Sequence, residues 1–80
     1  MKLWLISQTA NDRYDTFDSA VVVAETAEDA CRIHPAGDDN AWDYTWSTWA
    51  KTPEEVSAEY IGEARPDILQ GVVLASFNAG

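Results

Sequence analysis

Cys31 and His34 are the only cysteine and the only histidine of the chain, and they stand three residues apart. Side chains at that spacing share one face of a helix, so a thiol–imidazole dyad is geometrically conceivable. The alternative is a small buried thiol, followed by an imidazole that faces the free carbonyl groups at a helix C-terminus. We favour these structural roles. We therefore expect no catalytic residue and predict that the chain is not an enzyme.

Aspartates gather in two short stretches of the chain. They are Asp12, Asp15 and Asp18 in the first stretch and Asp38, Asp39 and Asp43 in the second. An EF-hand loop starting at Asp38 would need glycine where Asp43 stands, and a glutamate at its twelfth position, which this sequence lacks. The first stretch has no neighbouring histidine or cysteine. We predict no metal and no cofactor, and interpret both stretches as solvated loops.

Trp42 stands among the aspartates of the second stretch. Carboxylates interleaved with an aromatic side chain can combine steering by charge with an anchor for a partner. The predicted partner-binding residues are Asp12, Asp15, Asp18, Asp38, Asp39, Trp42 and Asp43. A place in the core stays an equal alternative for Trp42, and core burial is favoured for Trp46 and Trp49.

The 80 residues include 14 acidic and 5 basic side chains, for a formal charge of −9. This charge opposes direct contact with DNA or an anionic membrane. A compact chain of this length is ~30 Å across, and duplex DNA that long carries ~18 charges. The carboxylates come close to that total but are spread over all sides, so a DNA mimic would also need a matching shape.

The apolar start of the chain, residues 1–6, is too short for a signal peptide or a membrane helix. A single cysteine excludes a disulfide within the chain. These features predict one soluble domain over residues 1–80 in a reducing compartment.

The elements that position these side chains are predicted from periodicity and capping residues. Strands are expected over residues 2–8, 19–25, 56–63 and 71–77. Thr26 is expected to cap a helix of about two turns that ends before Pro35, and Thr52 with Pro53 predicts one more helical turn. The order strand–strand–helix–strand–strand predicts an α+β fold, a mostly antiparallel four-stranded sheet with one short helix packed on one face.

Further expectations concern the layout of these elements. Residues 2–8 and 71–77 are apolar on both faces, which predicts that both strands lie in the middle of the sheet and exchange their amides slowest. Residues 36–44 are expected to lead away from the core. Residues 44–50 are expected to be extended, although the spacing of their aromatic residues also fits a helix. The sheet face opposite the helix is expected to meet aromatic residues of this middle stretch or a partner.

Several segments are similar to one group of known proteins. They read MKLWLISQ at residues 1–8, YDTFDSAVV at 14–22, IHP at 33–35, EYIGEA at 59–64 and VLASFNAG at 73–80. The chain thereby resembles a family of short phage and prophage proteins ending in ASFNAG, most of them without an assigned function. The resemblance covers nearly the whole chain except residues 38–50, and it implies a fold more than a chemistry.

As a small, acidic, phage-like chain, the protein is also similar by class to anti-CRISPR proteins of type I systems, with subtype I-C as one candidate. This resemblance implies a non-enzymatic inhibitor in the cytoplasm of a bacterial host. It would bind a subunit of a type I CRISPR surveillance complex (Cascade) and block target DNA binding through an acidic surface. The alternative is a phage accessory module that binds another host protein. Neither function involves direct contact with nucleic acid or membrane, and a monomer is favoured.

Overall fold

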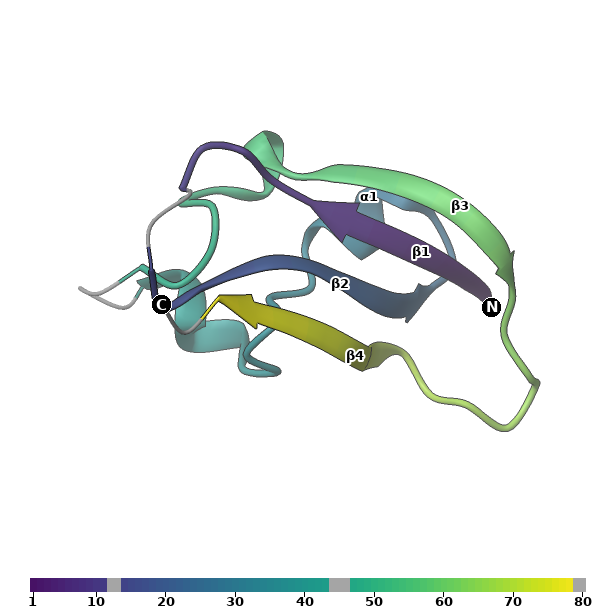
Figure 1. Cartoon of the computed structure of the whole chain (residues 1–80). Helices are drawn as coiled ribbons and strands as arrows, with labels where there is room; N and C mark the ends of the chain where they lie inside the picture. The colour runs from purple at the N-terminus through teal and green to yellow at the C-terminus, as the bar shows by residue number, and fades with distance from the viewer. Residues whose placement is uncertain (12–13, 44–46, 79–80) are drawn as a thin grey trace.

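The structure is a computed structural model that describes residues 1–11, 14–43 and 47–78, without the side chain of Asp39. Within these residues lie the strands β1 (Lys2–Ser7), β2 (Thr16–Ala24), β3 (Ser57–Glu63) and β4 (Gly71–Asn78), the helix α1 (Ala27–Cys31), and the 3-10 helices η1 (Asp39–Asp43) and η2 (Pro53–Glu55). The strands form one antiparallel sheet in the order β3-β1-β2-β4, and α1 packs on one face of it (Figure 1). The predicted α+β fold is confirmed.

Helix α1 begins where the sequence predicts. The Thr26 hydroxyl accepts a hydrogen bond of 3.1 Å from the backbone N–H of Asp29, which satisfies one of the free donors of the first turn. The helix has only five residues, fewer than the two turns expected. A helix this short is unstable by itself. Ala30, fully buried in the core, holds it against the sheet.

The hydrophobic core lies between α1 and one face of the sheet, here named the covered face. It consists of Ile6, Ala20, Val22, Ala24, Ala30, Trp49, Ala50 and Val56. Trp49 is fully buried, which confirms the prediction for this residue, and Trp46 lies outside the described residues. Because Trp49 packs with Ala30, it covers the same sheet face as the helix.

Side-chain amides hold residues 47–50 against the strands. Asn11 Nδ2 donates to the carbonyl oxygens of Ser47 and Trp49, both at 3.2 Å. The backbone N–H of Phe17 donates to the Thr48 carbonyl at 2.7 Å. Gln8 in turn fixes Asn11, since its Oε1 accepts the Asn11 backbone N–H at 2.7 Å. These residues form no strand, so the extended segment expected over residues 44–50 is wrong for 47–50, while residues 44–46 lie outside the described residues.

The other face of the sheet, here named the open face, is built of rows that cross all four strands. Directly paired residues share a face. The pairing therefore places Glu59, Leu5, Val21 and Leu74 in one row and Ser57, Ser7, Ser19 and Ser76 in another. Leu74 is 69% exposed. Within the described residues, the aromatic cover considered for this face is wrong, because Trp42 and Trp49 pack on the core side.

Strand β4 lies at an edge of the sheet, so the prediction that residues 71–77 lie in its middle is wrong. β4 pairs with β2 alone, and β3 takes the free side of β1. The central strands are β1 and β2. Val73, Leu74 and Phe77 of β4 are 53%, 69% and 47% exposed. Apolar composition on both faces is thus not a sign of central position here, because strand order depends on which pairings the connections allow.

Candidate protein-binding surface

Residues 35–43 fold back onto the core after α1. Gly37 has φ +78°, and its N–H donates to the His34 carbonyl at 2.9 Å, which reverses the chain. Asp38 Oδ1 then accepts the N–H of Asn40 at 2.9 Å where η1 begins. Ala41 is 4% exposed. The expectation that residues 36–44 lead away from the core is wrong for the described ones, because this turn brings the apolar side of η1 inward.

A chain of aromatic contacts joins η1 to the sheet. Trp42 meets His34 edge-on with ring centroids 5.1 Å apart, and His34 meets Phe17 at 6.4 Å. Phe17 contacts Phe77 of the edge strand at 4.9 Å. The indole N–H of Trp42 donates to the Arg32 carbonyl at 3.3 Å. Trp42 is half-buried and packs against the core, so it contributes to stability. Only its exposed part is accessible to a partner.

Cys31 and His34 have separate partners. The Cys31 thiol donates to the Val56 carbonyl at 3.4 Å, and burial raises its pKa, which disfavours the thiolate that a nucleophile needs. His34 Nδ1 accepts the N–H of Ala36 at 3.0 Å, so the neutral ring carries its proton on Nε2. Burial lowers the pKa of His34, and the charge of Asp38 partly opposes this. Cys31 therefore links α1 to the residue before β3, and His34 stabilises the turn that follows α1.

The exposed aspartates come together from two distant parts of the sequence. Asp15 and Asp18 lie at the start of β2, whereas Asp38 precedes η1 and Asp43 is its last residue. The contacts Phe17–His34–Trp42 join these segments, and Figure 1 shows the start of β2 and the teal η1 at the same end of the sheet. We name these four residues the acidic end. Two further predicted residues, Asp12 and the Asp39 side chain, lie outside what the structure describes.

Three carboxylates of the acidic end, those of Asp15, Asp18 and Asp43, have no cationic partner among the described residues. The ion pairs among the described residues, Arg32–Glu28 at 2.8 Å and Arg65–Asp67 at 3.4 Å, lie elsewhere. Asp15, Asp18 and Asp43 form no ion pair with any described residue. No group of three or more His, Cys, Asp or Glu side chains is placed to hold a metal ion within residues 1–11, 14–43 and 47–78. The acidic end can therefore attract cationic groups of a partner.

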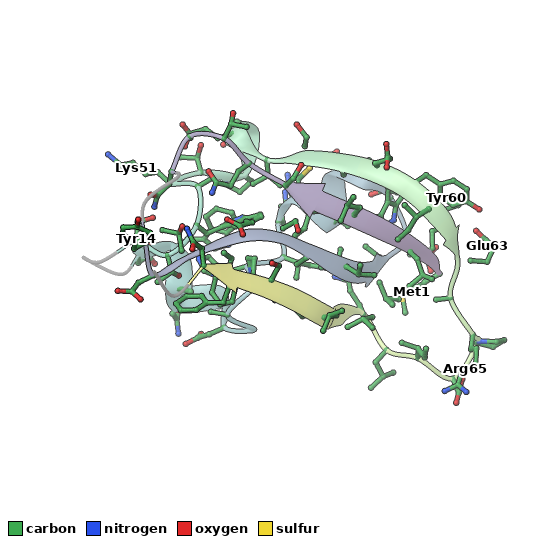
Figure 2. The ribbon with its side chains drawn as sticks, viewed as in Figure 1. Met1, Tyr14, Lys51, Tyr60, Glu63 and Arg65 are labelled. Carbon is green, nitrogen blue, oxygen red and sulfur yellow. The ribbon has the colours of Figure 1, made fainter. Side chains whose placement is uncertain are left out.

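Tyr14 is an exposed aromatic residue that sequence reasoning missed. It is 74% exposed and lies at the same end of the molecule as Lys51 (Figure 2). It directly precedes Asp15, whose φ of +60° turns the chain into β2. The same pairing of an aromatic residue with a carboxylate that singled out Trp42 also occurs here. Tyr14 is thus better placed than Trp42 to anchor a partner.

A cavity of about 300 Å³ lies between the turn after α1 and the start of β4. It is lined by Ile33, His34, Gly37, Asp38, Gln70, Gly71 and Val72. A cationic side chain that entered it would meet the Asp38 carboxylate in a lining that is largely polar. The cavity thus places Asp38 beside the first residues of β4.

The described part of the chain contains no helix long and apolar enough to cross a membrane. No protein-family model, no curated protein and no solved structure matches the sequence or its fold.

Proposed function

We propose that this chain is a non-enzymatic inhibitor that binds a type I CRISPR surveillance complex and blocks its binding to target DNA. The observation that carries this proposal is the acidic end, where Asp15, Asp18 and Asp43 are exposed without an ion pair to any described residue. The acidic end by itself would suit many basic proteins. The resemblance to small acidic phage proteins is the reason for choosing a type I CRISPR surveillance complex among them.

The binding mode follows from charge. A groove that holds a DNA backbone presents Lys and Arg side chains, and the acidic end offers carboxylates in place of phosphates. Charge of this kind speeds the encounter, while aromatic side chains that fill pockets set how long the complex lasts. Tyr14 has the exposure that such an anchor needs.

The direct test measures target DNA binding by a purified type I-C surveillance complex in the presence of the chain. We expect the chain to lower the fraction of DNA bound, and phage plaquing to rise in a host whose type I system is active. Unchanged DNA binding together with unchanged plaquing would contradict the proposal. Capture of a different host protein from infected cells, with no effect on either readout, would favour the alternative of an accessory module.

A charge-matched pair of variants separates the acidic end from net charge. The triple variant Asp15→Asn, Asp18→Asn and Asp43→Asn changes the formal charge from −9 to −6. The control variant Glu25→Gln, Glu59→Gln and Asp67→Asn makes the same change away from the acidic end. We expect the first to slow association by about tenfold at low salt and the second to change it far less. Equal effects of both would mean that net charge alone matters.

A further inference from the structure

Strand β4 presents an unprotected edge. It pairs with β2 on one side only, and its other side is the edge of the sheet (Figure 1). Apart from this pairing, the β4 backbone makes one further hydrogen bond among the described residues, in which the Asn78 carbonyl accepts from the Asp15 N–H. An edge strand with free N–H and C=O groups is a template for pairing with another strand.

The two edges of the sheet differ in how they are protected. The β3 edge carries Glu59 and Glu63, and such charges discourage pairing with another chain. An irregularity does not distinguish the two edges, because the register shifts at Leu3/Trp4 in the β1–β3 pairing and at Val21/Val22 in the β2–β4 pairing. The β4 edge has no charged residue, no proline and no lysine over its eight residues, and Val73, Leu74 and Phe77 are each about half exposed or more.

The charge of the whole chain indicates what pairs with this edge. Residues 68–80 form the longest uncharged run of a sequence whose formal charge is −9. Two copies that met through most other surfaces would bring carboxylates together, which is costly. The side chains of β4 itself are all apolar or small and polar. Repulsion between two copies of this acidic chain is therefore weaker at the β4 edge than at surfaces that carry carboxylates.

We propose that two copies of the chain associate through β4, which pairs antiparallel with β4 of the second copy and joins both sheets into one of eight strands. Antiparallel pairing of an edge with itself sets the two-fold axis perpendicular to the sheet, which closes the dimer and keeps both open faces on the same side. This goes beyond the proposed function and replaces the monomer expected from the sequence.

The alternation of side chains restricts the register of this pairing. Directly opposed residues must share a face, so the two-fold axis passes through a residue and not between two residues. Over Gly71–Asn78, an axis at Leu74 or at Ala75 keeps the faces matched if Val73, which the pairing with β2 skips, also stays out of the new pairing. Either register places Leu74 of each copy on the open face, opposite Leu74 or Ser76 of the other. Antiparallel pairing also directs the two acidic ends toward opposite ends of the joined sheet.

The first test is the mass of the purified chain in solution, by sedimentation equilibrium from about 10 μM to 1 mM. One strand pair buries less than a standard interface, so dissociation in this range is expected. We expect the mass to rise with concentration from 8.9 kDa toward twice that value. A chain that stays at the monomer mass throughout would overturn the proposal.

The second test places a cation on the edge. Leu74→Lys puts two like charges near the two-fold axis and should raise the dissociation constant by at least about tenfold. Ile61→Lys, at an exposed apolar position of the opposite edge, is the matched control and should leave it unchanged. A dimer that survives Leu74→Lys but not Ile61→Lys would place the interface at β3 and contradict the proposal.

The third test needs no variant and distinguishes edge pairing from stacking of the open faces. Amide hydrogen exchange of the unmodified chain is measured at dilute and at high concentration. Edge pairing protects the outward amides of Gly71–Asn78 as dimer forms, whereas stacking leaves them as fast as in the monomer. Protection that appears only when another protein is added would assign the edge to that protein and overturn self-pairing.

Discussion

The indole of Trp42 packs edge-on against the imidazole of His34, with ring centroids 5.1 Å apart and ring planes at 85°. The two residues are separated by a turn and the start of a 3-10 helix, and their contact holds η1 against the end of α1. This contact therefore also helps to position Asp38, which precedes η1, and Asp43, its last residue. It therefore links the stability of the fold to the shape of the acidic end.

Replacing Trp42 with Ala should lower the free energy of unfolding by about 2 kcal/mol, because a half-buried indole and its contacts are lost. Trp42→Phe, which keeps an aromatic ring against His34, should cost less. Tyr14→Ala serves as control, because a side chain that is 74% exposed should change stability by no more than about 0.5 kcal/mol. Urea denaturation measures all three variants. Equal losses at Trp42 and Tyr14 would contradict this assignment.

The stability of the fold should depend on the ionisation of His34. Burial lowers its pKa below the ordinary value of 6.5, so between the two pKa values the unfolded chain binds more protons than the folded one. The contribution of the neutral ring is complete above pH 6.5 and is lost as the pH falls through the folded-state pKa. Unfolding free energies of the unmodified chain and of His34→Gln, measured from neutral to acidic pH, should converge as the pH falls.

Asp38 supplies the control for this pH dependence, since its charge faces His34 and raises the pKa that burial lowers. In Asp38→Asn the pKa of His34 should fall further, and the loss of stability should extend to lower pH. If the free energies of unfolding of the unmodified chain and of His34→Gln differed by the same amount at all pH values, the pKa of His34 would be the same in the folded and unfolded chain, which would contradict this prediction.

Asn11→Ala should destabilise the fold by about 1–3 kcal/mol, because the carbonyl groups of Ser47 and Trp49 both lose their donor. The segment that carries the buried Trp49 would then be held by fewer bonds. Asn40→Ala is the matched control at an exposed position and should change stability by no more than about 0.5 kcal/mol. Tryptophan fluorescence during urea unfolding reports both. A silent Asn11→Ala would mean that packing of Trp49 alone holds this segment.

Replacing Asp38, Asp39 and Asp43 with Asn should slow association with the partner complex and flatten its dependence on salt, since exposed charges act mainly on the encounter. Stability should change by no more than about 0.5 kcal/mol. Tyr14→Ala should instead speed dissociation. Association and dissociation rates, measured on an immobilised complex at several salt concentrations, separate these effects. Unchanged kinetics for the triple variant would leave Asp12, Asp15 and Asp18 as the candidate carboxylates for binding.

Local rules of the backbone made several elements predictable. Thr26 as helix cap, Pro53 at the first position of a helical turn, and the four strands follow from side-chain preferences that act within a few residues. The burial of Trp49 was predictable because a large aromatic residue without nearby charges is most stable in a core. The acidic residues themselves were also visible as two separate stretches.

Strand order, by contrast, was not predictable from the same rules. The segment 71–77 has the composition of a central strand, yet β4 pairs with β2 alone and exposes Leu74. Residues 36–43 have the polarity of an outlying loop, yet Gly37 turns them back and Trp42 finds His34. Each outcome depends on contacts between residues far apart in the sequence.

The sequence by itself determined the α+β class, the helix cap, the strands and the excess of negative charge, because these depend on composition and on neighbours along the chain. Only the tertiary structure decided that β4 is an edge, that Tyr14 is exposed while Trp42 is half-buried, and that the start of β2 and η1 lie at the same end of the sheet. The physical reason is that pairing and burial are long-range. Each residue's exposure is set by whichever distant segments gain most from packing together.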